Sequence, residues 1–146
     1  DGYEDPDASA ADVALGDGVN IFLAGDSTVA NYAGRNEGSW GEAIQNYFDK
    51  EKVTIANYAL GGRSSRTFIN EGHLDTIAEN IKNGEYLFIQ FGHNDSWNSG
   101  SNPDRYVPLG TADTSGIYPD KLKEILDLNL LDFVSLDVKT TFSKYK

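Results

Sequence analysis

Val19-Asn20-Ile21-Phe22-Leu23-Ala24 is a short apolar run that ends at Gly25. A run of this length, closed by a glycine, is typical of a strand buried on both faces of a parallel sheet. Residues 53–59 and 86–91 repeat the pattern, and each run is soon followed by glycine. The sequence therefore predicts buried strands that begin at residues 19, 53 and 86.

Two segments between these runs have the periodicity of amphipathic helices. Apolar side chains recur at helical spacing over residues 40–51, where Ser39 is placed as N-cap and Trp40 and Tyr47 fall on the buried face. Residues 74–82 form the second helix, with Gly84 as its C′ cap. The apolar face of that helix is Leu74, Ile77, Ala78 and Ile81. Alternating strands and helices predict a doubly wound, flavodoxin-like α/β sheet, whose ligands bind beyond the carboxyl ends of its strands.

Size and charge narrow the classes of protein to consider. A chain of 146 residues supports one core, so we expect a linker or flexible arm over residues 1–18 and a single domain over 19–146. The 23 acidic side chains outnumber the 12 basic ones, and a net charge of -11 disfavours nucleic acid and anionic membranes as partners. We expect neither a membrane span nor an intact signal peptide in this sequence. Cysteine is absent, which excludes disulfides and thiolate metal sites. Neither a P-loop nor a G-x-G-x-x-G occurs to support a nucleotide, and we expect no cofactor.

Each predicted strand leads into a polar loop, and parallel topology brings the three loops to one edge of the sheet. The first loop carries Ser27, whose hydroxyl we expect to be exposed there, with a following helix N-terminus supplying positive potential. The second and third loops carry Gly62 and Asn94. A glycine N–H and an asparagine amide are suitable donors to the oxyanion of an acyl-transfer intermediate. The plain alternative for Ser27 is that it only caps a helix.

The three loops together resemble the conserved blocks of SGNH (GDSL-type) hydrolases, in particular the rhamnogalacturonan acetylesterase-like branch. The matching blocks are Ala24-Gly25-Asp26-Ser27-Thr28, Gly62-Arg63-Ser64 and Gly92-His93-Asn94-Asp95, with Trp40-Gly41-Glu42 in support. The resemblance covers roughly the region from Ile21 to Tyr118. It implies the three-layer fold of that family and a secreted, metal-free serine esterase that removes acetyl groups from a polysaccharide. It also implies that Ser27 is the nucleophile, with its own N–H, the Gly62 N–H and the Asn94 amide as the oxyanion hole.

The sequence departs from the family at the general base. The family supplies the base from an Asp-x-x-His block near the end of a longer chain, whereas the two histidines here, His73 and His93, follow Asn70 and Gln90 instead. We expect His73 at a helix start and His93 in a structural hydrogen bond. A serine without a base is a poor nucleophile at neutral pH, so we predict weak or no hydrolysis by these residues alone.

Other interpretations remain open at this point. Asp26 and Asp95 could be the carboxylate pair of a glycosidase, although that leaves the Asn and Gly blocks unexplained. The chain could also be a non-catalytic carbohydrate-binding module that keeps the cleft without the base. Arg63 and Arg66 could bind the carboxylate of an acidic sugar or form surface ion pairs. Tyr32 and Trp97 could stack on sugar rings, whereas Trp40 is expected in the core.

The remaining expectations concern the end of the sequence. A polar loop over residues 97–119 precedes a predicted helix that begins near Pro119 and a last short strand over residues 133–138. After Pro119 the sequence no longer resembles the family. An exposed sheet edge would then favour self-association or marginal folding.

Overall fold

The computed structural model describes residues 13–32, 36, 38–96, 103–107 and 127. In this part of the chain, β1 (Val19–Gly25), β2 (Val53–Asn57) and β3 (Tyr86–Gln90) form one parallel sheet in the order β2-β1-β3. The central strand β1 aligns Ile21 with Ile55 on one side and with Tyr86 on the other. This order is the beginning of the flavodoxin-like arrangement, and it confirms the α/β prediction.

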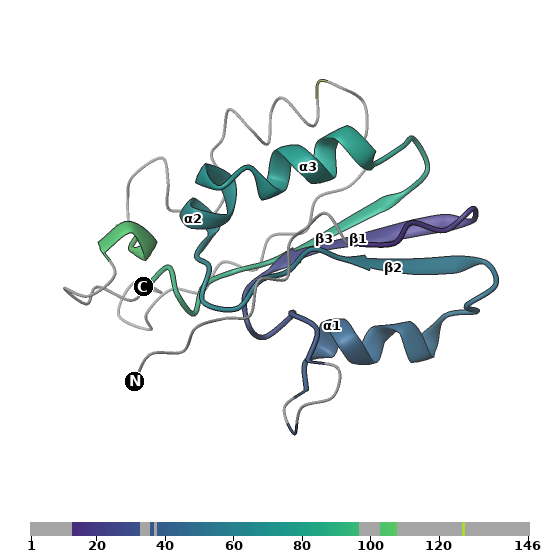
Figure 1. Cartoon of the computed structure of the whole chain (residues 1–146), viewed down its shortest axis with the longest axis horizontal. Coiled ribbons are helices and arrows are strands. Elements are labelled where there is room, and N and C mark those ends of the chain that lie inside the picture. The colour runs from purple at the N-terminus through teal and green to yellow at the C-terminus, as the bar shows by residue number, and fades with distance from the viewer. Residues whose placement is uncertain (1–12, 33–35, 37, 97–102, 108–126, 128–146) are drawn as a thin grey trace, which may run out of the picture.

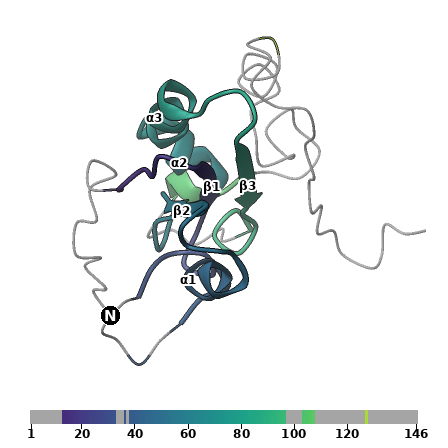
Figure 2. The same cartoon turned by 90° about the vertical axis from the view of Figure 1, so that its right-hand side faces the viewer.

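Helices cover both faces of the sheet (Figures 1 and 2). The chain runs from β1 to β2 through α1 (Trp40–Ala43) and the 3₁₀ helix η2 (Ile44–Tyr47), which lie on one face. It returns across β1 to β3 through α2 (Ser65–Asn70) and α3 (His73–Asn80) on the other face. Crossovers of one hand that run in opposite directions across the sheet put their helices on opposite faces, which produces the three layers.

Alternation along β1 divides the core into two parts. Phe22 and Ala24 face α2 and α3, and the buried Phe68 and Ile77 of those helices pack in the same cluster. The neighbouring residues Ile21 and Leu23 pack on the other face of the sheet. The central strand is thus apolar on both sides, as the unbroken apolar run indicates. Partners on that second face are Val29, Ala30, Ala59, Ile44, Phe48, Val53 and Ile55.

The helix predicted over residues 40–51 is shorter and less regular than expected. Ser39 is its N-cap and accepts from Glu42 N at 3.1 Å, as predicted. After Ala43 the chain tightens to 3₁₀ geometry, and the Gln45 amide reaches β2, donating to Val53 O and accepting from Ile55 N. The predictions that Trp40 lies in the core and Tyr47 on the buried face are wrong, since their exposed fractions are 36% and 84%.

The segment between β2 and β3 also differs from the prediction. The helix α2 was not predicted; Ser64 is its N-cap and forms a capping box with Thr67. The next helix begins at His73, as predicted, but it ends at Asn80 with Ile81 as C-cap. Gly84 is therefore not its C′ cap: with φ of +87° it occupies the third position of a turn in which Glu85 N donates to Lys82 O.

Several expectations fall wholly or partly outside the described residues. These are the linker before residue 13, Trp97, most of the 97–119 loop, the helix after Pro119 and the strand over 133–138. Within the expected linker, Gly16 exchanges hydrogen bonds with the buried Asn20, and Val13 packs against the core. No helix in the described part of the chain is long and apolar enough to span a membrane.

Candidate active site

Asp26 organises the turn that carries Ser27. Its carboxylate, only 1% exposed, accepts from Thr28 N at 2.9 Å and from Thr28 Oγ1 at 2.8 Å. The Asp26 carbonyl accepts from the N–H groups of Val29 and Ala30, both at 3.0 Å. This is a single turn, so the helix expected directly after Ser27 is not found there. A short polar side chain that binds its own backbone two residues on is the usual way to fix such a turn.

Ser27 itself is half-buried, and its polar atoms have no partner among the described residues. Within the described residues, neither its N–H nor its hydroxyl forms a hydrogen bond. Asp26 supplies the capping interactions that the plain alternative assigns to Ser27. The serine is therefore held in place by its neighbours while its own polar atoms remain open to a ligand.

Close packing explains the two glycines around this turn. A Cβ on Gly25 would lie 2.5 Å from Val29 Cγ2 and 2.8 Å from the carbonyl oxygen of Gln90. A Cβ on Gly41 would lie 2.0 Å from the carbonyl oxygen of Val29. The first turn of α1 thus packs directly on the turn after Ser27, and Ser39 Oγ adds a hydrogen bond of 2.7 Å to Ala30 O.

The second loop is attached to the first by the continuation of the β1–β2 ladder. Leu60 N donates to Gly25 O at 3.0 Å, immediately before the Gly61-Gly62 turn. Gly62 adopts φ of +71°, a conformation that glycine reaches without steric cost, and its N–H has no hydrogen-bond partner in the described part of the chain. Asn57 joins the loops again, since its Nδ2 donates to Val29 O at 2.7 Å.

The third loop follows β3 and contacts the second. Asn94 is 8% exposed, and its Nδ2 donates to Arg63 O at 2.9 Å. A side-chain amide carries two N–H donors, so one remains for a ligand. The next residue, Asp95, accepts from both the N–H and the hydroxyl of Ser65. Burial raises the pKa of the Asp95 carboxyl, the negative charge of Asp26 adds to the rise, and the hydrogen bonds from Ser65 and from the Gly92 backbone oppose it.

Both predicted carboxylates therefore have structural partners, which disfavours the glycosidase interpretation. Asp26 is bound to Thr28 and Asp95 to Ser65. Arg63 forms an ion pair with Glu71, with Nε and Oε2 3.0 Å apart, in agreement with the simpler of its two interpretations. Arg66 lies half-buried on α2.

Neither histidine forms a hydrogen bond with Ser27 in the described part of the chain. His73 begins α3, and its Nε2 lies 2.8 Å from Glu71 Oε2. The side chain of His93 is exposed, and its ring forms no hydrogen bond to any described residue, so the structural hydrogen bond expected for it is not found. The described residues also contain no cluster of His, Cys, Asp and Glu that could hold a metal ion.

Two arginines make contacts at the site that the sequence analysis did not predict. Arg105, on η3 (Pro103–Arg105), lies against Gly62, because a Cβ on that glycine would be 3.0 Å from Arg105 Nη2. Arg63 makes two contacts that were also missed. Its backbone carbonyl accepts from Asn94 Nδ2, and its side-chain Nη1 donates to Gly61 O at 3.2 Å. The position of Arg63 inside the Gly62-Arg63-Ser64 block was the available signal.

Residues 21–135 match the GDSL-like lipase/acylhydrolase family. The sequence is 44% identical over 89 residues to the probable rhamnogalacturonan acetylesterase YesY of Bacillus subtilis, a match that covers 60% of this chain and 40% of YesY. It is also 44% identical over 75 residues to the rhamnogalacturonan acetylesterase of Emericella nidulans, covering 51% of this chain and 28% of that protein. The chain thus spans less than half of the length of these relatives.

A solved structure supports the same assignment of fold. The crystal structure of YxiM from Bacillus subtilis superposes with a TM-score of 0.55 at 30% sequence identity. The superposition covers 75% of this chain and 29% of YxiM.

Proposed function

The chain belongs to the GDSL-like lipase/acylhydrolase family, and we propose that it provides the nucleophile and oxyanion hole of a carbohydrate acetylesterase. Its substrate would be an acetylated polysaccharide such as rhamnogalacturonan. The names of the relatives YesY and the Emericella nidulans enzyme give rhamnogalacturonan as the substrate of those proteins. An extracellular location accords with such a substrate.

The proposal rests on a set of N–H donors that have no hydrogen-bond partner within the described residues and lie at the carboxyl ends of the three strands. Hydrogen bonds attach the Ser27 loop to the Gly62 loop and the Gly62 loop to Asn94. The N–H groups of Ser27 and Gly62 are unbonded within the described residues, and Asn94 keeps a spare donor. Preorganised donors of this kind stabilise the oxyanion as it develops.

In the proposed mechanism, Ser27 Oγ attacks the acetyl carbonyl and the three donors bind the resulting oxyanion. Collapse of this intermediate breaks the bond to the sugar oxygen, which takes up the proton lost by Ser27 and leaves as a hydroxyl. Water then attacks the acetyl group on Ser27 and releases acetate. A general base is required to accept the serine proton, and the printed sequence has no Asp-x-x-His to supply it. We therefore expect residual hydrolysis by this chain, roughly 10³ to 10⁴ over water by analogy with triads that have lost a member.

An activated aryl acetate and a fluorophosphonate test this proposal together. We expect slow hydrolysis and covalent labelling that both disappear in Ser27→Ala. Turnover as fast as that of full-length relatives would refute the prediction of weak hydrolysis. Equal rates for Ser27→Ala and the parent chain would refute the role of Ser27.

A non-catalytic carbohydrate-binding module is the second candidate. It is favoured by the two histidines, because His73 is engaged with Glu71 and His93 is exposed without a ring hydrogen bond in the described region. Binding of an acetylated pectin oligosaccharide in calorimetry, without labelling of Ser27, would favour this module over the esterase.

A further inference from the structure

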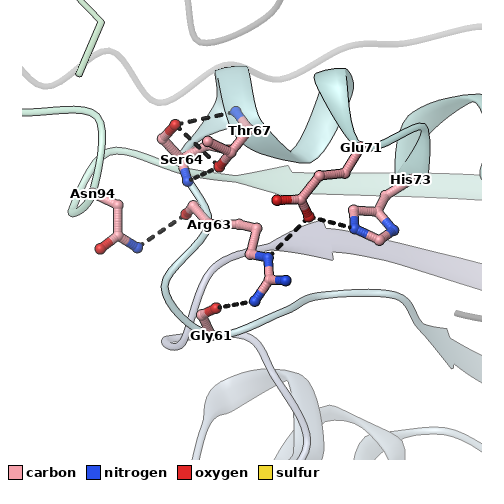
Figure 3. A network of polar contacts seen from close by, with 7 residues as sticks. All are labelled: Gly61, Arg63, Ser64, Thr67, Glu71, His73 and Asn94. Atoms are coloured by element: carbon pink, nitrogen blue, oxygen red, sulfur yellow. Dashed lines mark hydrogen bonds and ion pairs between the residues drawn. The ribbon is translucent and has the colours of Figure 1, made fainter. Parts of the chain in front are cut away.

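Arg63 contacts Asn94 and Gly61, which carry or adjoin two of the three proposed oxyanion donors (Figure 3). Its backbone carbonyl accepts from Asn94 Nδ2 at 2.9 Å, and its guanidinium Nη1 donates to Gly61 O at 3.2 Å. The carbonyl of Gly61 and the N–H of Gly62 belong to one planar peptide unit. One residue is therefore bonded to the groups that carry two of the three proposed donors.

We propose that Arg63 is a positioning residue that orients the Gly62 N–H and the Asn94 amide toward the oxyanion. The inference rests on the proposed function, because it assigns Arg63 a role within that site. It differs from both sequence-based interpretations of Arg63, which were binding of a substrate carboxylate and a surface ion pair.

Peptide planarity explains how a bond to Gly61 acts on Gly62. The carbonyl and the N–H of a trans peptide point in opposite directions, so fixing the oxygen also fixes the direction of the N–H. Glycine has a broad conformational range, so a contact to the peptide that precedes Gly62, which has φ of +71°, restricts the orientation of that peptide. A charged donor on the carbonyl also polarises the peptide and strengthens its N–H as a donor.

The short helix α2 holds Arg63 from both of its ends. At the start, Ser64 is the N-cap, and Thr67 Oγ1 accepts from Ser64 N at 2.9 Å. At the end, the C-cap Glu71 accepts from Arg63 Nε at 3.0 Å and contacts His73 Nε2 through the same oxygen, Oε2. The Arg63 guanidinium is thus fixed between Glu71 and Gly61 rather than extended toward solvent (Figure 3).

A positioning role and a substrate-binding role make different kinetic predictions. If Arg63 orients the donors, its loss lowers kcat for every ester, including a neutral one, and leaves KM nearly unchanged. If Arg63 binds a substrate carboxylate, its loss raises KM for acidic substrates and leaves a neutral aryl acetate unaffected.

The test uses the whole chain with Arg63→Met, Arg63→Lys and the matched surface control Lys50→Met, and a neutral aryl acetate as substrate. We expect Arg63→Met to lower the Ser27-dependent kcat and the rate of fluorophosphonate labelling by about 10-fold to 100-fold, since loss of a whole donor costs ~10² to 10³. Arg63→Lys, which keeps one donor, should recover part of the rate. Lys50→Met should match the parent chain, because Lys50 is exposed and remote from the three loops.

Glu71→Ala tests whether the ion pair of Glu71 with Arg63 is needed to hold Arg63 on Gly61. It should lower kcat in the same direction, and the double variant with Arg63→Met should be no worse than Arg63→Met alone, because both act through one contact. Additive losses would overturn the role of Glu71 as the holder of Arg63.

Nuclear magnetic resonance of the ¹⁵N-labelled chain separates failure of the inference from failure of the proposed function. In Arg63→Met, the Gly62 backbone amide should shift whether or not the chain hydrolyses esters. The Asn94 side-chain amide should change less, because the substitution keeps the backbone carbonyl to which it donates. An unchanged Gly62 resonance in a folded Arg63→Met, or in Arg63→Leu should Arg63→Met not fold, would overturn the inference. Loss of Ser27 dependence with the Gly62 shift present would instead overturn the esterase proposal and leave Arg63 as the residue that orients the loops.

Discussion

Gly25→Ala should destabilise the sheet at the point where the Ser27 turn begins. The added Cβ would lie 2.5 Å from Val29 Cγ2 and 2.8 Å from the carbonyl oxygen of Gln90. Gln90 is paired with Gly25 in the β1–β3 register, so its oxygen cannot move without disturbing the ladder. Val29 is fully buried and held at its N–H by Asp26, so it also has little room to move.

Overpacking of this kind costs typically about 1 to 3 kcal/mol, and we expect the upper part of that range because one contacted atom is backbone. For a chain of this size, each kcal/mol lowers the melting temperature by roughly 2 to 4 °C. Thermal denaturation should therefore show a melting temperature lower by about 4 to 12 °C. Urea denaturation should show an unfolding free energy lower by about 2 to 3 kcal/mol. Gly38→Ala is the matched control, because a Cβ at Gly38 meets nothing within 4 Å. A Gly25→Ala protein that melts with Gly38→Ala and the parent chain would refute the packing argument.

Two further predictions concern pH and association. Burial raises the pKa of Asp95 in the folded chain, so folding favours the protonated carboxyl. The resulting stabilisation is complete below the pKa of the unfolded chain, ~3.9, and is lost as pH rises through the pKa of the folded chain. The difference in unfolding free energy between the parent chain and Asp95→Asn, measured in urea, should fall as pH rises across that window, and a rising difference would contradict it. The outer edge of β3, where the exposed fractions of Tyr86 and Phe88 are 57% and 38%, should pair with a second copy of this chain. Sedimentation should then show self-association that Phe88→Lys weakens, whereas a parent chain that is monomeric at every concentration and melts cooperatively would argue against such pairing.

The contrast between the two sheet edges explains why β3 is singled out. At the edge strand β2, the Gln45 side chain donates to Val53 O and accepts from Ile55 N, and so occupies the free backbone groups. No comparable contact covers the outer edge of β3 within the described residues. Native sheets usually protect their edges with such side chains, so an unprotected edge is the one expected to associate.

The strands could be predicted from sequence because their burial leaves a simple pattern. Apolar runs closed by glycine located β1, β2 and β3, and their alternation with helices indicated a doubly wound parallel sheet. The helices were harder to predict, since their boundaries depend on tertiary contacts. The helix expected over residues 40–51 changes to 3₁₀ geometry where Gln45 reaches β2, and a periodicity count cannot register a side chain bonded to a neighbouring strand.

The loops show a similar division. Recognition of the blocks selected Ser27, Gly62 and Asn94 as candidate site residues, whereas the residues that contact their loops were assigned other roles. Trp40 was expected in the core because its spacing is helical, yet its indole N–H donates to Gln90 and its ring stays partly exposed. The short helix α2 was missed because its cap lies inside a glycine- and serine-rich segment that indicates a loop.

Orientation of the site and its competence for turnover depend on different residues. The proposed oxyanion donors are fixed by contacts within residues 25–95, chiefly the Asp26 turn, the Leu60 bond to Gly25 and the two bonds made by Arg63. Acceptance of the serine proton needs a base that none of these contacts provides. Labelling of Ser27 by a fluorophosphonate should therefore respond to the network around Arg63, while the rate of ester turnover should respond mainly to whatever imidazole can reach the serine hydroxyl. An added imidazole that accelerates hydrolysis in the parent chain, but not in Ser27→Ala, would show that the oxyanion hole is already formed and that the base alone limits the rate.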